Sequence, residues 1–133
     1  IENFDPSLPS INIDKDSMIQ VFDNVFINCF ESSNFLNSSY IKVSTEFSFG
    51  QTIKIPNIKS SLKKNHILIR IEDNGKGIVK ENLEKIFFPF FSTKKRGSGV
   101  GLFLVKKIIS YHNGEISVHS NDKTTCVIIK LPL

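Results

Sequence analysis

The sequence contains no tryptophan and one methionine, so most of its aromatic content is supplied by 12 phenylalanines. It also lacks a signal peptide and any apolar run of membrane-spanning length, and we therefore expect no membrane contact by this domain. Cysteine is scarce: Cys29 and Cys126 lie in apolar runs, and no CxxC pair is present. This pattern predicts two buried thiols rather than a disulfide framework, and it favours a reducing, cytoplasmic compartment.

A strong excess of charge is also absent. The formal net charge of +4 suits a phosphate-bearing ligand but is too small to indicate nucleic acid binding. The length of 133 residues and the hydrophobic content of 40% predict one globular domain with its own core, spanning residues 1–133. Because the sequence begins at Ile1 rather than at a methionine, we expect this domain to be a fragment of a longer protein.

Hydrophobic periodicity divides the chain into alternating helical and extended segments. Apolar residues at helical spacing predict an amphipathic helix over 15–32, with Asp14 or Asp16 as its N-cap. In chain order, the whole pattern predicts an extended segment, that helix, two strands, two further helices and a final strand pair, over 1–13, 15–32, 38–49, 66–72, 80–86, 100–112, 115–120 and 124–131. Residues 50–65, which are polar and basic, are predicted to form a loop or an irregular hairpin.

The most informative stretch is the turn Asp-Asn-Gly-Lys-Gly-Ile at 73–78, which follows the predicted strand 66–72. A carboxylate held at the end of a strand can accept a hydrogen bond from the exocyclic amine of adenine. Gly75 and Gly77 would let the backbone pass close to a flat ring, because glycine has no Cβ. Taken alone, the same residues are equally typical of a surface turn.

A second glycine cluster, Gly-Ser-Gly-Val-Gly-Leu at 97–102, opens the predicted helix downstream. It has the spacing of neither a P-loop nor a dinucleotide fingerprint. Its glycines can nevertheless leave backbone N–H groups facing an anion at a helix N-terminus. The basic run Lys94-Lys95-Arg96 precedes it and follows the aromatic run 87–91, so we expect a basic lid over 92–98, disordered or variable without nucleotide.

The polar face of the first predicted helix carries Asn24 and Asn28 one turn apart. Exposed helix faces usually carry lysine, glutamate or glutamine, since asparagine is a poor helix former. The amide oxygen of Asn28 is a hard ligand that suits magnesium, and Asn24 is placed to orient the ligand shell. An ordinary solvated face is the alternative interpretation.

Together these segments resemble the ATP-binding domain of sensor histidine kinases, in the superfamily shared with gyrase, the heat-shock chaperone and mismatch-repair ATPases. Residues 24–28 resemble the N box, 73–78 the first glycine box, 87–91 the F box and 97–102 the second glycine box. Segments 5–9, 89–94 and 123–125 are most similar to nitrogen-regulation sensor kinases. Glu31 departs from the pattern, because many members carry a basic or amide residue there, and no role is assigned to it.

The resemblance implies an α+β fold, a two-layer α/β sandwich in which helices cover one face of a mixed, mostly antiparallel sheet (the Bergerat-type ATP-binding fold). ATP and Mg²⁺ are the implied cofactors, with Asn28 as the metal ligand and Asp73 as the partner of the adenine amine. The full set of ATP-binding residues that it implies is Asn24, Asn28, Asp73, Gly75, Gly77, Ile78, Lys94, Arg96, Gly97, Ser98, Gly99, Val100, Gly101, Leu102 and Thr125.

The implied activity is that of a protein histidine kinase. The γ-phosphoryl group would pass to a histidine on the protein's own dimerisation domain and from there to a response regulator, with the full-length protein a homodimer. Asn24 stands where gyrase-type ATPases carry a glutamate base, so we expect no rapid ATP hydrolysis. We also expect no self-labelling, because no histidine lies in an acceptor-like helical run. The three histidines of the chain, His66, His112 and His119, are interpreted as structural. The alternative is a nucleotide-binding interaction module without phosphotransfer.

Overall fold

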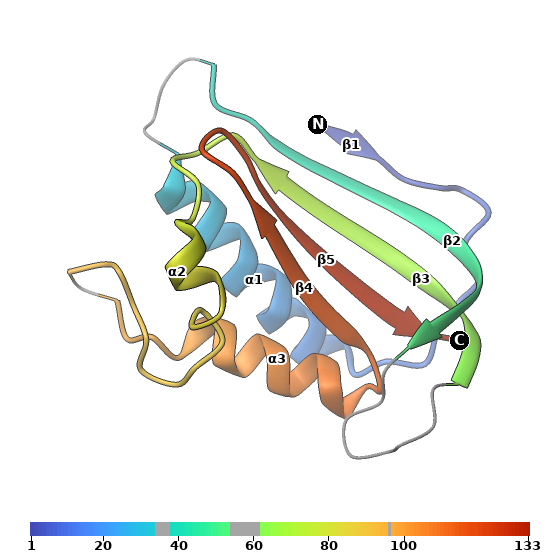
Figure 1. Cartoon of the computed structure of the whole chain (residues 1–133). Helices are drawn as coiled ribbons and strands as arrows, with labels where there is room; N and C mark the ends of the chain where they lie inside the picture. The colour runs from blue at the N-terminus through green and yellow to red at the C-terminus, as the bar shows by residue number, and fades with distance from the viewer. Residues whose placement is uncertain (34–37, 54–61, 96) are drawn as a thin grey trace.

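The computed structural model describes residues 1–33, 38–53, 62–95 and 97–133. In chain order its elements are β1 (Glu2–Asn3), α1 (Lys15–Ser32), β2 (Ile41–Ile53), β3 (Leu62–Asp73), α2 (Lys80–Leu83), α3 (Gly101–Tyr111), β4 (Glu115–Ser120) and β5 (Thr125–Pro132). The strands form one sheet in the order β1-β2-β3-β5-β4, and the helices lie together on one of its faces (Figure 1). The predicted two-layer α+β sandwich is confirmed.

The sheet is mixed but mostly antiparallel, as expected. The short strand β1 pairs parallel with β2, whereas the β2–β3, β3–β5 and β5–β4 pairs are all antiparallel. Asp73 is the last residue of β3 and pairs with Ile41 on one side and Thr125 on the other. The carboxylate at the end of this central strand is therefore flanked by two neighbouring strands.

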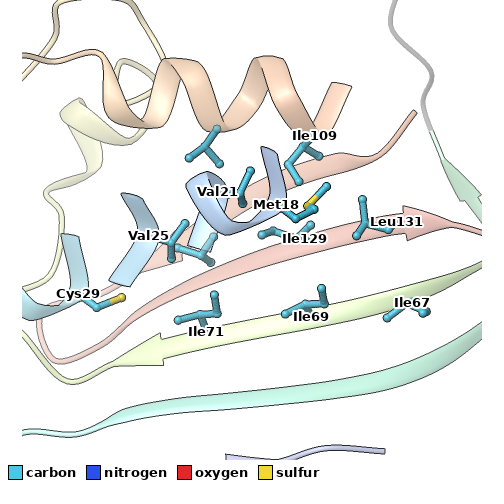
Figure 2. Close-up of a cluster of buried hydrophobic side chains, with 12 residues drawn as sticks. Met18, Val21, Val25, Cys29, Ile67, Ile69, Ile71, Ile109, Ile129 and Leu131 are labelled. Atoms are coloured by element: carbon cyan, nitrogen blue, oxygen red, sulfur yellow. The ribbon is translucent and has the colours of Figure 1, made fainter. Parts of the chain in front are cut away.

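The core lies between the sheet and the helices α1 and α3. Alternate residues of β3 and β5 face the helices, because successive side chains of a strand point to opposite faces. The buried cluster consists of Met18, Val21, Val25, Cys29, Ile67, Ile69, Ile71, Val105, Ile109, Val127, Ile129 and Leu131. Figure 2 shows Cys29 at one end of this cluster. Since α1 uses its apolar face here, its polar face is left for the site described below.

The first helix matches its prediction. It begins after Asp14, whose carboxylate accepts the Ser17 N–H at 2.7 Å and thereby satisfies a backbone donor of the first turn. This hydrogen bond from Ser17 lowers the pKa of Asp14 below its ordinary value. Asp14 rather than Asp16 is thus the N-cap. α3 is likewise close to its predicted bounds, and Asn113 beyond its end has φ 56°, the left-handed conformation typical of a helix stop.

Residues 50–65 are predicted to form a loop or an irregular hairpin, and their described parts follow the second alternative, with antiparallel strand pairing at both ends of the segment. β2 continues to Ile53 and β3 begins at Leu62, while residues 54–61 lie outside the described part of the chain. The pairing shifts register between Ser48 and Gln51, and Gly50 has φ 56° there. A bulge of this kind interrupts the side-chain alternation, although the backbone ladder resumes beyond it. The predicted helix 80–86 is also too long, because α2 ends at Leu83 and is followed by turns.

Candidate nucleotide-binding site

A cavity of about 630 Å³ lies between the polar face of α1, the turn after β3 and the segment that leads into α3. This volume is within the range of small-molecule sites. The predicted site residues that line it are Asn24, Asn28, Asp73, Gly77, Ile78, Lys94, Gly97, Ser98, Gly99, Gly101, Leu102 and Thr125. Gly75 and Val100 are not in its lining, and Arg96 lies outside the described residues. Segments distant in sequence thus meet around one cavity.

The carboxylate of Asp73 is buried at the base of this cavity, with an exposed fraction of 2%. Its Oδ1 accepts hydrogen bonds from Ser32 Oγ at 2.7 Å and from the Gly75 N–H at 2.9 Å. Burial, reinforced by the Asp73 charge, raises the pKa of the Cys29 thiol to about 12, so the thiol keeps its proton. The carboxylate is held in its orientation by the Ser32 hydroxyl and the Gly75 N–H.

Ser32 and Cys29 line the cavity beside Asp73, and the sequence interpretation did not include them. The Ser32 hydroxyl also lies 2.8 Å from the Cys29 carbonyl, so its one proton is shared between that oxygen and Asp73. Ser32 follows Asn28 by one helical turn, as Asn28 follows Asn24, and this spacing was an available signal. No comparable signal marked Cys29, because its position continues the apolar face of α1.

The turn after Asp73 is fixed against the β4–β5 connection. Gly77 has φ 73°, and a Cβ at this position would lie 2.1 Å from the backbone oxygen of Asn121. The next N–H, that of Ile78, donates to Ser120 Oγ at 2.8 Å. That hydroxyl in turn lies 2.9 Å from the hydroxyl of Thr125, which is buried. Only glycine fits at position 77, so this wall of the cavity depends on it.

The opposite end of the cavity is formed where α3 begins. Its N-cap residue is Val100, which makes no side-chain cap hydrogen bond. The N–H groups of the first turn of α3 therefore receive no acceptor from the N-cap side chain. A Cβ on Gly101 would lie 2.7 Å from Asn24 Oδ1, which shows how closely α1 approaches the start of α3. The Asn24 amide donates to the Gln20 carbonyl at 2.8 Å. Uncapped N–H groups at a helix N-terminus favour an anion such as phosphate.

Lys94 reaches across the cavity from the segment before α3. Its ammonium donates to Asn28 Oδ1 at 2.7 Å and forms an ion pair with the Glu31 carboxylate. Asn28, which was predicted to bind magnesium, therefore contacts a cation through its amide oxygen. That cation is the ammonium group of Lys94, which was predicted to contact the phosphates. Among the residues that the structure describes, no three His, Cys, Asp or Glu side chains form a metal site.

The aromatic run 87–91 connects α2 to this segment. Phe91 lines the cavity, whereas Phe88 and Phe90 are exposed, so the run is not simply part of the core. The Lys106 ammonium lies 5.3 Å from the centre of the Phe87 ring, a cation–π contact that ties the run to α3. The predicted change of residues 92–98 on nucleotide binding stays a prediction.

A buried carboxylate, an uncapped helix N-terminus and an amide oxygen that holds a cation fit an adenine nucleotide with a divalent ion. Residues 13–133 match the family of histidine kinase-, DNA gyrase B- and HSP90-like ATPases. The chain belongs to this family. This histidine kinase-like ATPase domain is 34% identical over 133 residues to the sensory histidine kinase/phosphatase NtrB of Azospirillum brasilense, and it covers 33% of that protein. The NtrB of Rhodobacter capsulatus is 35% identical, with 36% of its length covered.

The chain thus spans about a third of the length of these relatives, and the match extends over all of the chain. Its fold is similar to the solved catalytic domain of the histidine kinase ThkA, with a TM-score of 0.76 and 26% identity over 98% of the chain and 76% of that structure. The ATPase domain is therefore the catalytic ATP-binding domain of the histidine kinase class. In the described residues, no helix is both long and apolar enough to cross a membrane.

Proposed function

We propose that this domain binds ATP with Mg²⁺ and donates the γ-phosphoryl group to a histidine on a separate dimerisation domain. The observation that carries the proposal is the polarity of the cavity. Asp73 is buried against Ser32 at the C-terminal end of α1, whereas the uncapped start of α3 lies against Asn24, about two turns earlier on that helix, and Lys94 is bonded to Asn28 between them. ATP has a complementary distribution of charge: its adenine ring carries a neutral amine, and its phosphates carry the negative charge.

Each part of the nucleotide has a partner in this arrangement. The adenine amine would donate to Asp73, next to Gly77 and Thr125. The phosphates would accept from the first turn of α3 and from Lys94. Asn28 would hold magnesium, with Asn24 supporting it from the preceding turn. When bound, magnesium neutralises phosphate charge and helps to orient the transferred group.

The nucleophile for transfer has no source in this site. Asn24 carries an amide where a general base would stand, and an amide cannot accept a proton from water or serine. His66 is buried, and His112 accepts the Asp14 N–H on Nε2 at 3.0 Å while its Nδ1 lies 2.8 Å from the Ile108 carbonyl. His119 lies in β4 rather than in a helix. An acceptor imidazole supplied by another domain is consistent with these placements.

The proposal extends to the whole protein. Residues 1–133 would form the single catalytic domain of a longer, homodimeric two-component sensor kinase that works in the cytoplasm, where its two free cysteines stay reduced. Its other partners would be its own dimerisation domain and a response regulator. The similarity to NtrB proteins supports a place among nitrogen-regulation kinases.

Titration calorimetry of ATP with and without Mg²⁺ tests the binding step. Wild-type domain should bind ATP more tightly with magnesium, and Asn28→Ala should remove most of that gain. Gln20→Ala is the matched control, since Gln20 is an exposed polar residue on the same helix that does not line the cavity. If Asn28→Ala keeps the full gain, the metal assignment is wrong, and if wild-type domain binds no ATP, so is the proposed function.

A further inference from the structure

Two oxygens of α1 hold one ammonium group in this site. Lys94 Nζ lies 2.7 Å from Asn28 Oδ1 and is also bonded to a carboxylate oxygen of Glu31. Asn28 and Glu31 are three residues apart on a helix, so their side chains lie on the same face. Both residues line the cavity. The two oxygens therefore converge on a single point inside the proposed nucleotide site.

We infer that Asn28 and Glu31 together form the divalent-cation site of the nucleotide complex, and that Lys94 is the cation that occupies it in the free protein. This inference rests on the proposed function and adds Glu31 as a second protein ligand of the metal. An amide oxygen and a carboxylate oxygen are the hard ligands that magnesium prefers, and magnesium commonly uses one or two carboxylates together with substrate phosphates. The ammonium shows that both oxygens reach one cation at the same time.

The negative charge of Glu31 is a second argument for a metal ion at this position. A carboxylate in the lining of a cavity for a polyphosphate repels the ligand unless a cation lies between them. In the structure Lys94 is paired with Glu31 and is that cation. Once Lys94 turns to the phosphates, Glu31 would face them unpaired, and a divalent ion between Glu31 and the phosphates removes the repulsion.

The ion pair itself is weak enough to exchange. The Lys94 side chain is 34% exposed and that of Glu31 47% exposed, and half-exposed pairs of this kind contribute little to stability. Lys94 also lies 63 residues beyond Glu31, on the segment between the aromatic run and α3, so its release requires no change in α1. Lys94 therefore acts as a tethered competitor of the metal and, after exchange, as a phosphate ligand.

The test compares ATP binding with Mg²⁺ and with a chelator, in wild-type domain and in Glu31→Gln. With Mg²⁺, Glu31→Gln should weaken ATP binding by about tenfold or more, as is typical when metal coordination is impaired. With chelator, the same variant should bind ATP as tightly as wild type or more tightly, because a repulsive charge is gone. Asp23→Asn is the matched control: Asp23 is exposed on the same helix outside the cavity lining, and neither condition should change.

Opposite effects in the two conditions distinguish a metal ligand from a mere negative charge. If Glu31→Gln tightens ATP binding in both conditions, or changes neither, the metal role of Glu31 is wrong while the proposed function stands. If wild-type domain shows no magnesium-dependent ATP binding, the proposed function fails first. Glu31 is half exposed, so circular dichroism should show an unchanged fold in the variant.

A second measurement tests the exchange without nucleotide. Free Mn²⁺ can be followed by electron paramagnetic resonance while it is titrated with protein. Lys94→Gln should raise the Mn²⁺ affinity by about two- to fivefold, the equivalent of losing one partly exposed ion pair. Adding Glu31→Gln to Lys94→Gln should abolish this gain. No gain in the single variant would show that Lys94 does not compete for the cation site.

Discussion

Replacement of Asp73 by asparagine is the sharpest test of the base pocket. Oδ1 of Asp73 already accepts from Ser32 and from the Gly75 N–H. If the new amide keeps its oxygen toward these donors, its NH₂ group must face the adenine amine, and two donors meet. If it flips, its NH₂ group faces the backbone N–H instead. Asparagine therefore cannot satisfy both sides of the pocket.

The size of the effect follows from two terms. A hydrogen bond to a charged group contributes about 1.5–3 kcal/mol, and a buried donor without an acceptor costs about 1–3 kcal/mol. Together they predict a loss of about 2.5–6 kcal/mol, so the Kd for ATP should rise at least about fiftyfold by calorimetry. Inosine triphosphate carries a carbonyl in place of the amine, and Asp73→Asn should bind it better than wild type does. Equal losses for ATP and inosine triphosphate would refute the assignment of Asp73 to the base pocket.

Three further predictions concern residues that surround Asp73: Ser32, Gly77 and Cys29. Ser32→Ala removes one donor to Asp73 and should raise the Kd for ATP about two- to tenfold in calorimetry, whereas an unchanged Kd would exclude a positioning role. Gly77→Ala should destabilise the fold by about 1–3 kcal/mol or more in urea, and Gly50→Ala, at a similar φ but with nothing within 4 Å of its added Cβ, should cost less. Because the pKa of Cys29 is raised to about 12, iodoacetamide at about pH 8 should modify it only after denaturation, and the free energy of unfolding should fall as the pH rises above 9.0.

Much of this fold is predictable because its side-chain patterns are local. α1 spans 15–32 in both the prediction and the structure, since a period of 3.6 residues and the Asp14 cap specify it together. The ends of β2 and β3 were missed for a physical reason. Ladder hydrogen bonds join backbone groups, and beyond the bulge near Gly50 they continue through polar residues that show no clear alternation.

The site was predictable as a set of motifs but not as a set of contacts. Asp73 was identifiable from its position between a strand and a glycine-rich turn. Its hydrogen bond with Ser32 spans 41 residues, and no local pattern reports such a distance. The same limit applies to Lys94, which was predicted to contact phosphates and in the structure bridges Asn28 and Glu31. Long-range pairing of polar side chains depends on how α1, the sheet and the segment before α3 are packed together.

The central claim is that this domain donates a phosphoryl group and does not accept it. The most direct measurement is incubation of the domain with γ-labelled ATP, alone and with the dimerisation domain of the same protein. We predict an unlabelled catalytic domain, slow release of phosphate, and an acid-labile label on the added dimerisation domain. ATP binding without any transfer would instead indicate an interaction module. Rapid hydrolysis by the domain alone, or label on His66, His112 or His119, would contradict the account.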